Sequence, residues 1–85
     1  MDRQICIVGL LVEDRACHGP EVQEILTRHG SHIVMRSGIP DPGRKRGIIT
    51  LVTQSDDDQL SKLESDLQGV HGVTVKSVVL GGALG

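Results

Sequence analysis

The residues best suited to ligand chemistry follow an apolar run near the start of the chain, at positions 13–19 (Glu-Asp-Arg-Ala-Cys-His-Gly). Pro20 suits the first position of a helix, so Gly19 is predicted to be the N-cap. The free amides of a helix N-terminus attract anions, and glycine lets a bound group approach the backbone. Asp14, Arg15 and Gly19 are therefore the candidate residues for binding the carboxylate or phosphate of a small ligand. An ordinary connection between strand and helix is the simpler alternative.

A basic segment at Arg44, Lys45 and Arg46, with Arg36 as a further candidate, could contact an anion, a nucleic acid or the acidic residues 56–58 of a neighbouring subunit. A solvated loop that protects a sheet edge is the simpler alternative. The chain has 9 basic and 11 acidic residues and a net charge of −2, which gives no general attraction to nucleic acid or anionic membranes. Because no aromatic residue is present to stack on bases, direct nucleic-acid binding is not expected.

Four histidines and two cysteines raise the question of a metal site. Cys17 and His18 should lie at one end of the first helix and His29 and His32 at the other, roughly 15 Å apart at 1.5 Å per residue. The two groups therefore cannot share one ion within a subunit. His29 and His32 remain weak metal candidates, since a solvated histidine at a helix C-terminus has a simpler electrostatic role. No metal or other cofactor is predicted.

No catalytic arrangement stands out in the sequence. The consecutive carboxylates Asp56, Asp57 and Asp58 point in different directions, and capping of a helix that opens at Ser55 explains them. The chain has neither a glycine-rich phosphate loop between a strand and a helix nor a Gly-x-Ser-x-Gly elbow. No catalytic residue is predicted, and an enzyme is the least expected class of function.

The apolar pattern predicts the element order β-α-β-β-α-β. Residues 5–12 are apolar on both alternating sets, which is typical of a central strand. A helix over residues 19–29 should end at a left-handed Gly30. Further strands are expected at about 31–39, 46–53 and 73–80, and the second helix is expected to run from Ser55 to Gly69.

The more polar strands, 31–39 and 73–80, suit the edges of the sheet. The predicted fold is therefore an α+β ferredoxin-like plait with antiparallel strand order 4-1-3-2 and both helices on one face. Residues 1–80 form the expected domain, and residues 81–85 are predicted to be a flexible C-terminal tail.

The sheet face without helices should be largely aliphatic. Monomers rarely expose a large apolar patch, so a homo-oligomer, either a dimer or a tetramer, is expected. The eight-residue apolar run is too short to span a membrane, and no signal peptide is visible. A cytoplasmic protein with reduced thiols is the expectation.

Several segments resemble the iron-only hydrogenase system regulators. The resemblance covers about residues 5–80 and is carried by Ile-Val-Gly at 7–9, Val-Glu-Asp-Arg at 12–15, Val-Gln-Glu-Ile-Leu at 22–26, Met-Arg-Ser-Gly-Ile-Pro at 35–40, Arg-Gly-Ile-Ile at 46–49 and Gly-Val-Thr-Val-Lys-Ser at 72–77. This family is similar to ACT domains and to the C-terminal domain of nickel-responsive repressors. The resemblance implies a ferredoxin-like regulatory module that oligomerises and has a role in transcriptional control.

The leading interpretation is an oligomeric ACT-like regulatory module. It would bind a small ligand near residues 14–19 and would be linked to transcriptional regulation of a hydrogenase-type system. One alternative is a metal-responsive module that uses His29, His32 or Cys17 at an interface. The other is a scaffold whose only activity is protein association.

Overall fold

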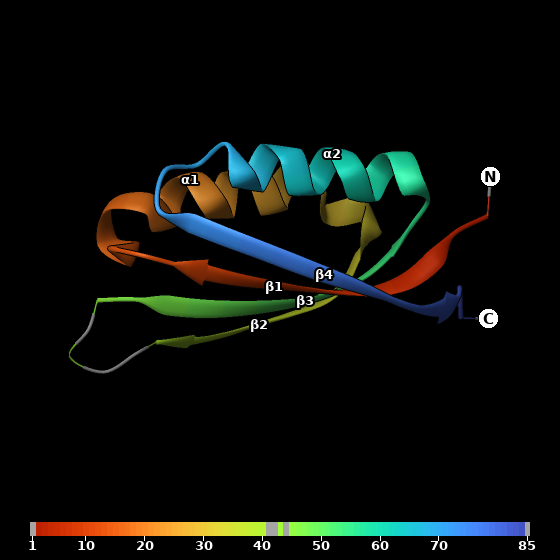
Figure 1. Ribbon diagram of the computed structural model, residues 1–85, viewed down its shortest axis with the longest axis horizontal. Helices are drawn as coiled ribbons and strands as arrows, with labels where there is room; N and C mark the ends of the chain where they lie inside the picture. The colour runs from red at the N-terminus through yellow and green to blue at the C-terminus, as the bar shows by residue number, and fades with distance from the viewer. Residues whose placement is uncertain (1, 41–42, 44, 85) are drawn as a thin grey trace.

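The computed structural model, which describes residues 2–40, 43 and 45–84, has one four-stranded antiparallel sheet with two helices on one face (Figure 1). The elements are β1 (Gln4–Val12), α1 (Arg15–Arg28), a 3-10 turn (Gly30–His32), β2 (Ile33–Pro40), β3 (Gly47–Ser55), α2 (Asp57–Gln68) and β4 (Val73–Gly82). The strands lie in the order β2-β3-β1-β4. The predicted ferredoxin-like plait, with β1 and β3 at the centre, is confirmed.

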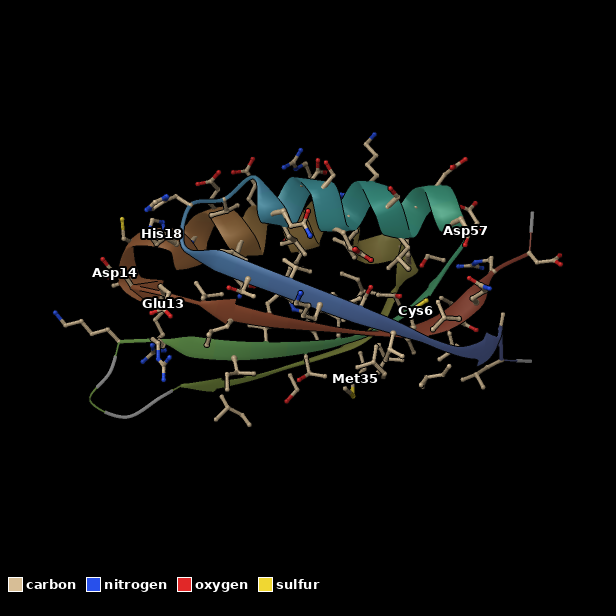
Figure 2. The ribbon with its side chains drawn as sticks, in the orientation of Figure 1. Cys6, Glu13, Asp14, His18, Met35 and Asp57 are labelled. Atoms are coloured by element: carbon tan, nitrogen blue, oxygen red, sulfur yellow. The ribbon has the colours of Figure 1, made fainter. Side chains whose placement is uncertain are left out.

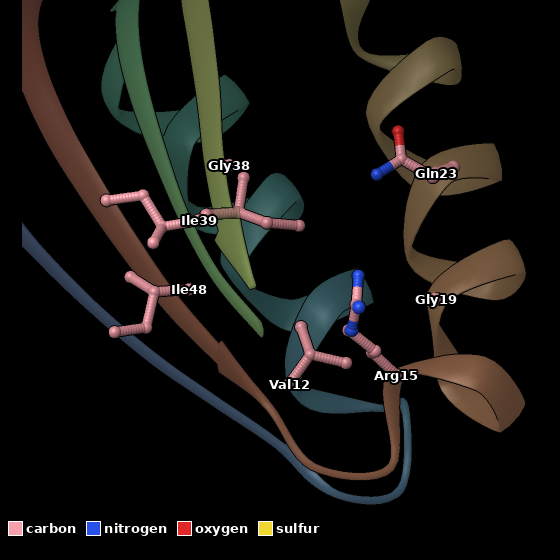
Figure 3. A pocket seen from close by; sticks show the side chains of 8 residues that line it. Val12, Arg15, Gly19, Gln23, Gly38, Ile39 and Ile48 are labelled. Carbon is pink, nitrogen blue, oxygen red and sulfur yellow. The ribbon is translucent and has the colours of Figure 1, made fainter. Parts of the chain in front are cut away.

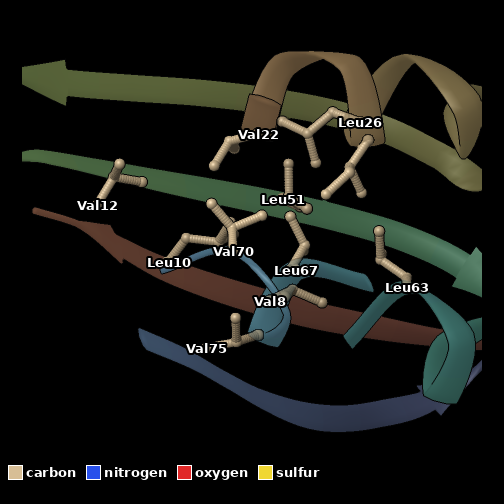
Figure 4. Close-up of a cluster of buried hydrophobic side chains, with 11 residues drawn as sticks. Val8, Leu10, Val12, Val22, Leu26, Leu51, Leu63, Leu67, Val70 and Val75 are labelled. Carbon is tan, nitrogen blue, oxygen red and sulfur yellow. The ribbon is translucent and has the colours of Figure 1, made fainter. Parts of the chain in front are cut away.

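β1 lies at the centre because both of its faces are apolar. One alternating set of its side chains points to the helices, and the core cluster that forms there is entirely aliphatic (Figure 4). The core residues are Val8, Leu10, Val12, Val22, Ile25, Leu26, Leu51, Leu63, Leu67, Val70 and Val75. Full burial of each such side chain contributes roughly 1.5–3 kcal/mol, so this cluster is what holds the helices on the sheet.

α1 begins four residues before the predicted position. Asp14 adopts a left-handed conformation (φ 46°, ψ 61°) and turns the chain directly from β1 into the helix. The amide of Arg15 then donates to the carbonyl of Lys45 at 2.8 Å. This bond gives the first N–H of the helix a partner, which an N-cap side chain would otherwise have to provide. The prediction that Gly19 is the N-cap was therefore wrong: Gly19 and Pro20 lie inside the helix.

The remaining helix ends also differ in detail from the sequence prediction. Gly30 opens the 3-10 turn instead of ending α1 in a left-handed conformation, and His29 closes α1 at φ −100°. The capping box of α2 exists but lies one residue later than predicted. Asp56 Oδ1 accepts from the Gln59 amide at 2.8 Å, and Gln59 Oε1 accepts from the Asp56 amide at 3.0 Å. Ser55 is instead the buried last residue of β3.

β4 continues beyond the boundary expected at residue 80. Gly81 and Gly82 pair with Ile5 and Gln4 after an irregularity in the register. The amide of Ala83 then donates to the carbonyl of Arg3 at 3.1 Å. Two residues of the expected flexible tail therefore belong to the sheet, because the start of β1 supplies partners for their backbone groups.

The sheet face opposite the helices has no cover among the described residues. Figure 2 shows Met35 on this side of the molecule, away from both helices. Ile39 is 64% exposed, Val78 55% and Ile48 48%, while Ile7 and Leu11 of β1 are only half-buried. The predicted aliphatic face is present, and we call it the bare face. No described helix has the length and apolarity needed to cross a membrane.

Candidate ligand groove between α1 and β2

A cavity of about 320 Å³ lies between the first turns of α1 on one side and the end of β2 and the start of β3 on the other (Figure 3). Its walls combine the aliphatic side chains of Val12 and Ile49 with a cation, an amide and two glycines. Ile39 and Ile48 border the cavity, but their side chains point away from α1 to the bare face (Figure 3). The lining residues are Val12, Arg15, Gly19, Gln23, Gly38, Ile39, Ile48 and Ile49. An apolar surface with a few polar groups is typical of small-molecule sites.

Arg15, Gly19 and Gln23 reach the cavity together because they are spaced by four residues on α1, which places them on one face of the helix. The stem of Arg15 runs against Gly47, where an added Cβ would lie 3.3 Å from Arg15 Cδ. Figure 3 shows the side chain pointing along the cavity toward Gln23. Within the described part of the chain, no hydrogen bond or ion pair engages the Arg15 guanidinium. It is therefore available to an anion.

Arg36 enters the same region from β2. Its register partner on β3 is Leu51, which is buried under the helices, so Arg36 also points to the helix side. Its Nη2 donates to Gln23 Oε1 at 2.8 Å and so joins β2 to α1. This bond links a cation to a neutral amide and leaves the charge of Arg36 uncompensated by that partner.

Two further cavities continue the first one along α1 and β2. The middle cavity, about 150 Å³, shares Gln23 and Gly38 with the first and adds Arg36 to the lining. The last cavity, about 300 Å³, lies beyond Arg36 and is lined mainly by apolar residues such as Leu26 and Ile33. We call the three together the α1–β2 groove.

The structure brings together only some of the predicted ligand residues. Arg15 and Gly19 line the groove, but Asp14 does not. The carbonyl of Asp14 accepts hydrogen bonds from the amides of Cys17 and His18 at 2.9 and 3.1 Å. Figure 2 shows Asp14 at the outer end of the molecule, near Glu13 and His18. Its role there is to shape the turn that starts α1.

The predicted basic segment does not act as one group. Lys45 is exposed, with a positive φ of 64°, and its carbonyl holds the first amide of α1. Arg46 Nη1 lies 3.7 Å from Glu13 Oε1 and so forms an ion pair with the connection that follows β1. Arg44 lies outside the described residues. Of the three basic candidates that the structure describes, only Arg36 lines the groove.

Sequence reasoning missed Gln23 and Gly38, which both line two of the cavities. A helix that starts at Arg15 would have revealed Gln23, because positions 15, 19 and 23 then share one face. Gly38 carried a weaker signal, an isolated glycine inside a strand pattern, which often marks a close approach to the backbone.

His29 was expected to be solvated, and that prediction was wrong. It is 6% exposed, and its Nε2 lies 2.8 Å from Asp66 Oδ2 on α2. The hydrogen bond from His29 is the main reason that the pKa of Asp66 falls below its usual range. The His32 ring is 5.8 Å from the His29 ring, centroid to centroid. Among the described residues, no three His, Cys, Asp or Glu side chains gather where they could hold a metal ion.

Comparison with protein families gives one match, which extends over most of the chain. The TM1266-like family, described as candidate iron-only hydrogenase system regulators, matches residues 4–77. The solved structure of TM1266 from Thermotoga maritima is 33% identical to this chain with a TM-score of 0.89, and the alignment covers 93% of this chain and 99% of that protein. No curated protein matches the chain.

More distant solved structures share the fold. The regulatory subunit of aspartate kinase from Thermus flavus has a TM-score of 0.56 at 19% identity, with 94% of this chain and 59% of that chain covered. The apo form of CPII from Thiomonas intermedia K12, a nitrogen regulatory PII-like protein, has a TM-score of 0.55 at 14% identity, with 91% of each chain covered. At these identities the likeness concerns the fold alone.

Proposed function

This chain belongs to the TM1266-like family of candidate iron-only hydrogenase system regulators, and from that premise we propose that it is an oligomeric regulatory module that binds a small anionic ligand in the α1–β2 groove. The occurrence of the same fold in a kinase regulatory subunit and a PII-like protein supports a regulatory role. The family description names a hydrogenase system, and we propose that the regulation acts on its transcription. Association of the bare faces would supply the oligomer.

The observation that carries the proposal is the position of Arg15. Its guanidinium engages in no hydrogen bond or ion pair among the described residues and points along a cavity that Val12 and Ile49 line with aliphatic side chains. Such a site would hold the carboxylate of a small molecule through a bidentate, charge-assisted hydrogen bond and its carbon skeleton through apolar contact. Asp14 does not line this cavity, and Gly19 contributes space because no atom lies within 4 Å of the position that a Cβ would take.

We predict that Arg15→Gln abolishes ligand stabilisation without unfolding the protein, because Arg15 is exposed and its backbone amide is retained. The experiment is a thermal-shift screen of amino acids, small carboxylic acids and nucleotides against the full chain. A ligand present at 100 times its dissociation constant adds about 2.7 kcal/mol of stability, which the screen detects readily.

Arg28→Gln is the matched control, because Arg28 is an exposed arginine in the last turn of the same helix and lies outside the groove. It should respond to the ligand as the unmodified chain does. Equal loss of the response in Arg15→Gln and Arg28→Gln would indicate a general charge effect and would contradict the proposed site. So would the absence of any stabilising compound at millimolar concentration.

A further inference from the structure

We propose that the ligand of the α1–β2 groove is a dicarboxylate, with one carboxylate on Arg15 and the other on Arg36. This inference rests on the proposed function and adds the chemical class of the ligand. It depends on the juxtaposition of two guanidinium groups from different elements along one aliphatic groove.

The charged side chains that line the groove are all positive among the described residues. Arg15 and Arg36 are the charged side chains among the described residues that line its three cavities, and no carboxylate lines any of them. Arg36 is satisfied by Gln23 Oε1, a neutral acceptor, at 2.8 Å. A carboxylate makes a stronger, charge-assisted pair with arginine than an amide oxygen does, so a ligand carboxylate can replace Gln23 as the partner of Arg36.

The spacing favours two anionic groups over one. Arg15 and Gln23 are eight residues apart on α1, which corresponds to roughly 12 Å along the helix axis, and Arg36 reaches the groove beside Gln23. The Arg15 side chain points toward Gln23 and shortens this gap (Figure 3). The two guanidinium groups approach from opposite ends of the span, so each can pair with its own carboxylate on a short carbon chain. Ile49 borders both the first and the middle cavity and provides apolar contact for that chain.

Two glycines keep the path between the arginines open. An added Cβ at Gly19 would meet no atom within 4 Å, and one at Gly38 would meet only the Ile48 carbonyl at 3.9 Å. Gly19 on α1 and Gly38 on β2 therefore leave space on both walls. Any larger residue there would project into the part of the groove that the carbon chain would occupy.

The test is calorimetric titration of the full chain with α,ω-dicarboxylates of increasing length, each paired with the monocarboxylate of the same carbon number. At the best length the dicarboxylate should bind about tenfold tighter or more, because it gains a second charge-assisted pair. Arg36→Gln should weaken the dicarboxylate much more than the monocarboxylate and so remove this advantage, whereas Arg36→Lys should retain part of it. Arg15→Gln should weaken both ligands, and Arg28→Gln neither.

Equal affinity for mono- and dicarboxylates at every length would overturn the inference, as would a dicarboxylate affinity that Arg36→Gln leaves unchanged. In both cases, monocarboxylate binding that depends on Arg15 would still support the proposed function. If no acid of either series binds, the proposed function and the dicarboxylate inference fail together.

Discussion

His29 and Asp66 join the two helices through one contact of 2.8 Å between Nε2 and Oδ2. His29 is buried at the end of α1, while Asp66 is partly open to solvent on α2. The groups that act on Asp66 are His29 first, followed by the more distant charges of Arg28 and Lys62. The carboxylate therefore lies in a cationic environment that stabilises its ionised form.

We predict that Asp66→Asn removes part of the acid sensitivity of the fold. The pKa of Asp66 is lowered from its usual value of 3.8, mainly by the hydrogen bond from His29. A lowered pKa in the folded state means that the stabilisation is complete above the unfolded-state value and is lost as the pH falls through the folded-state value. Urea midpoints of the two proteins should therefore differ at neutral pH and converge in strong acid.

Asp2→Asn serves as the control for this measurement, because Asp2 is an exposed carboxylate near the chain end. It should keep the full acid dependence of the unmodified chain. A gap between Asp66→Asn and the unmodified chain that stays constant down to strong acid would show that the ionisation of Asp66 is not what the contact depends on.

At the scale of elements, the start of α1 decides which residues meet in the groove. Pro20 has no amide proton, so it removes one hydrogen bond from within the helix. The helix nevertheless starts at Arg15, where the Lys45 carbonyl accepts from the first amide. This contact links α1 to the segment just before β3 and aligns positions 15, 19 and 23 on the face toward β2.

We predict that Gly19→Ala stabilises the protein by about 0.5–1 kcal/mol, because alanine replaces a glycine inside a helix and its Cβ meets open space. If Gly19 were an N-cap, the same change would destabilise the helix. The sign of the change in unfolding free energy, measured with urea, therefore tests the observed start of α1.

Gly72→Ala is the opposite case and serves as a control. Gly72 has a φ of 81°, and its added Cβ would lie 3.1 Å from His18 Cδ2. A left-handed conformation costs a residue with a side chain roughly 1–2 kcal/mol, so this variant should be less stable than the unmodified chain. Stabilisation by both alanines would contradict the backbone conformations described for these positions.

The elements of the fold could be predicted from the sequence because buried apolar residues recur with the period of a strand or a helix. The two-sided apolarity of β1 requires a central position, and the stripes containing Val22 and Leu63 require a helix face against the sheet. The groove could be predicted only in part. Arg15 and Gly19 were named, but Gln23 depends on a helix start set by Lys45, thirty residues away from Arg15, and no local pattern encodes that contact.

At the scale of the whole molecule, the bare face is the largest feature without a partner among the described residues. Four strands spaced by about 4.8 Å and nine residues long cover about 30 by 19 Å. Pairing two such faces would bury somewhat more than about 1,100 Å², near the lower end of specific interfaces. A small depression of about 310 Å³ over Gly9, lined also by Leu11 and Ile48, could receive a side chain from a second copy.

We predict that Val78→Lys converts a dimer of the chain to monomers. Val78 lies on the bare face opposite Ile7, is 55% exposed, and would place a charge in an apolar contact. Sedimentation equilibrium should show the dissociation constant raised about tenfold or more. Leu84→Lys is the control, because Leu84 is 71% exposed but follows the last strand. A monomeric unmodified chain at micromolar concentration would rule out association through this face.

The pairing of β1 with β4 brings the two ends of the chain side by side, at Arg3 and Ala83 (Figure 1). The cavity at Arg15, the first part of the groove, lies at the opposite end of β1, about 30 Å away for nine residues of strand. A short peptide could therefore close the chain into a circle, and the domain could be spliced into a surface loop of a reporter enzyme with the Arg15 cavity facing outward. The geometry suits construction of a biosensor in which occupancy of the distant groove changes the reporter signal.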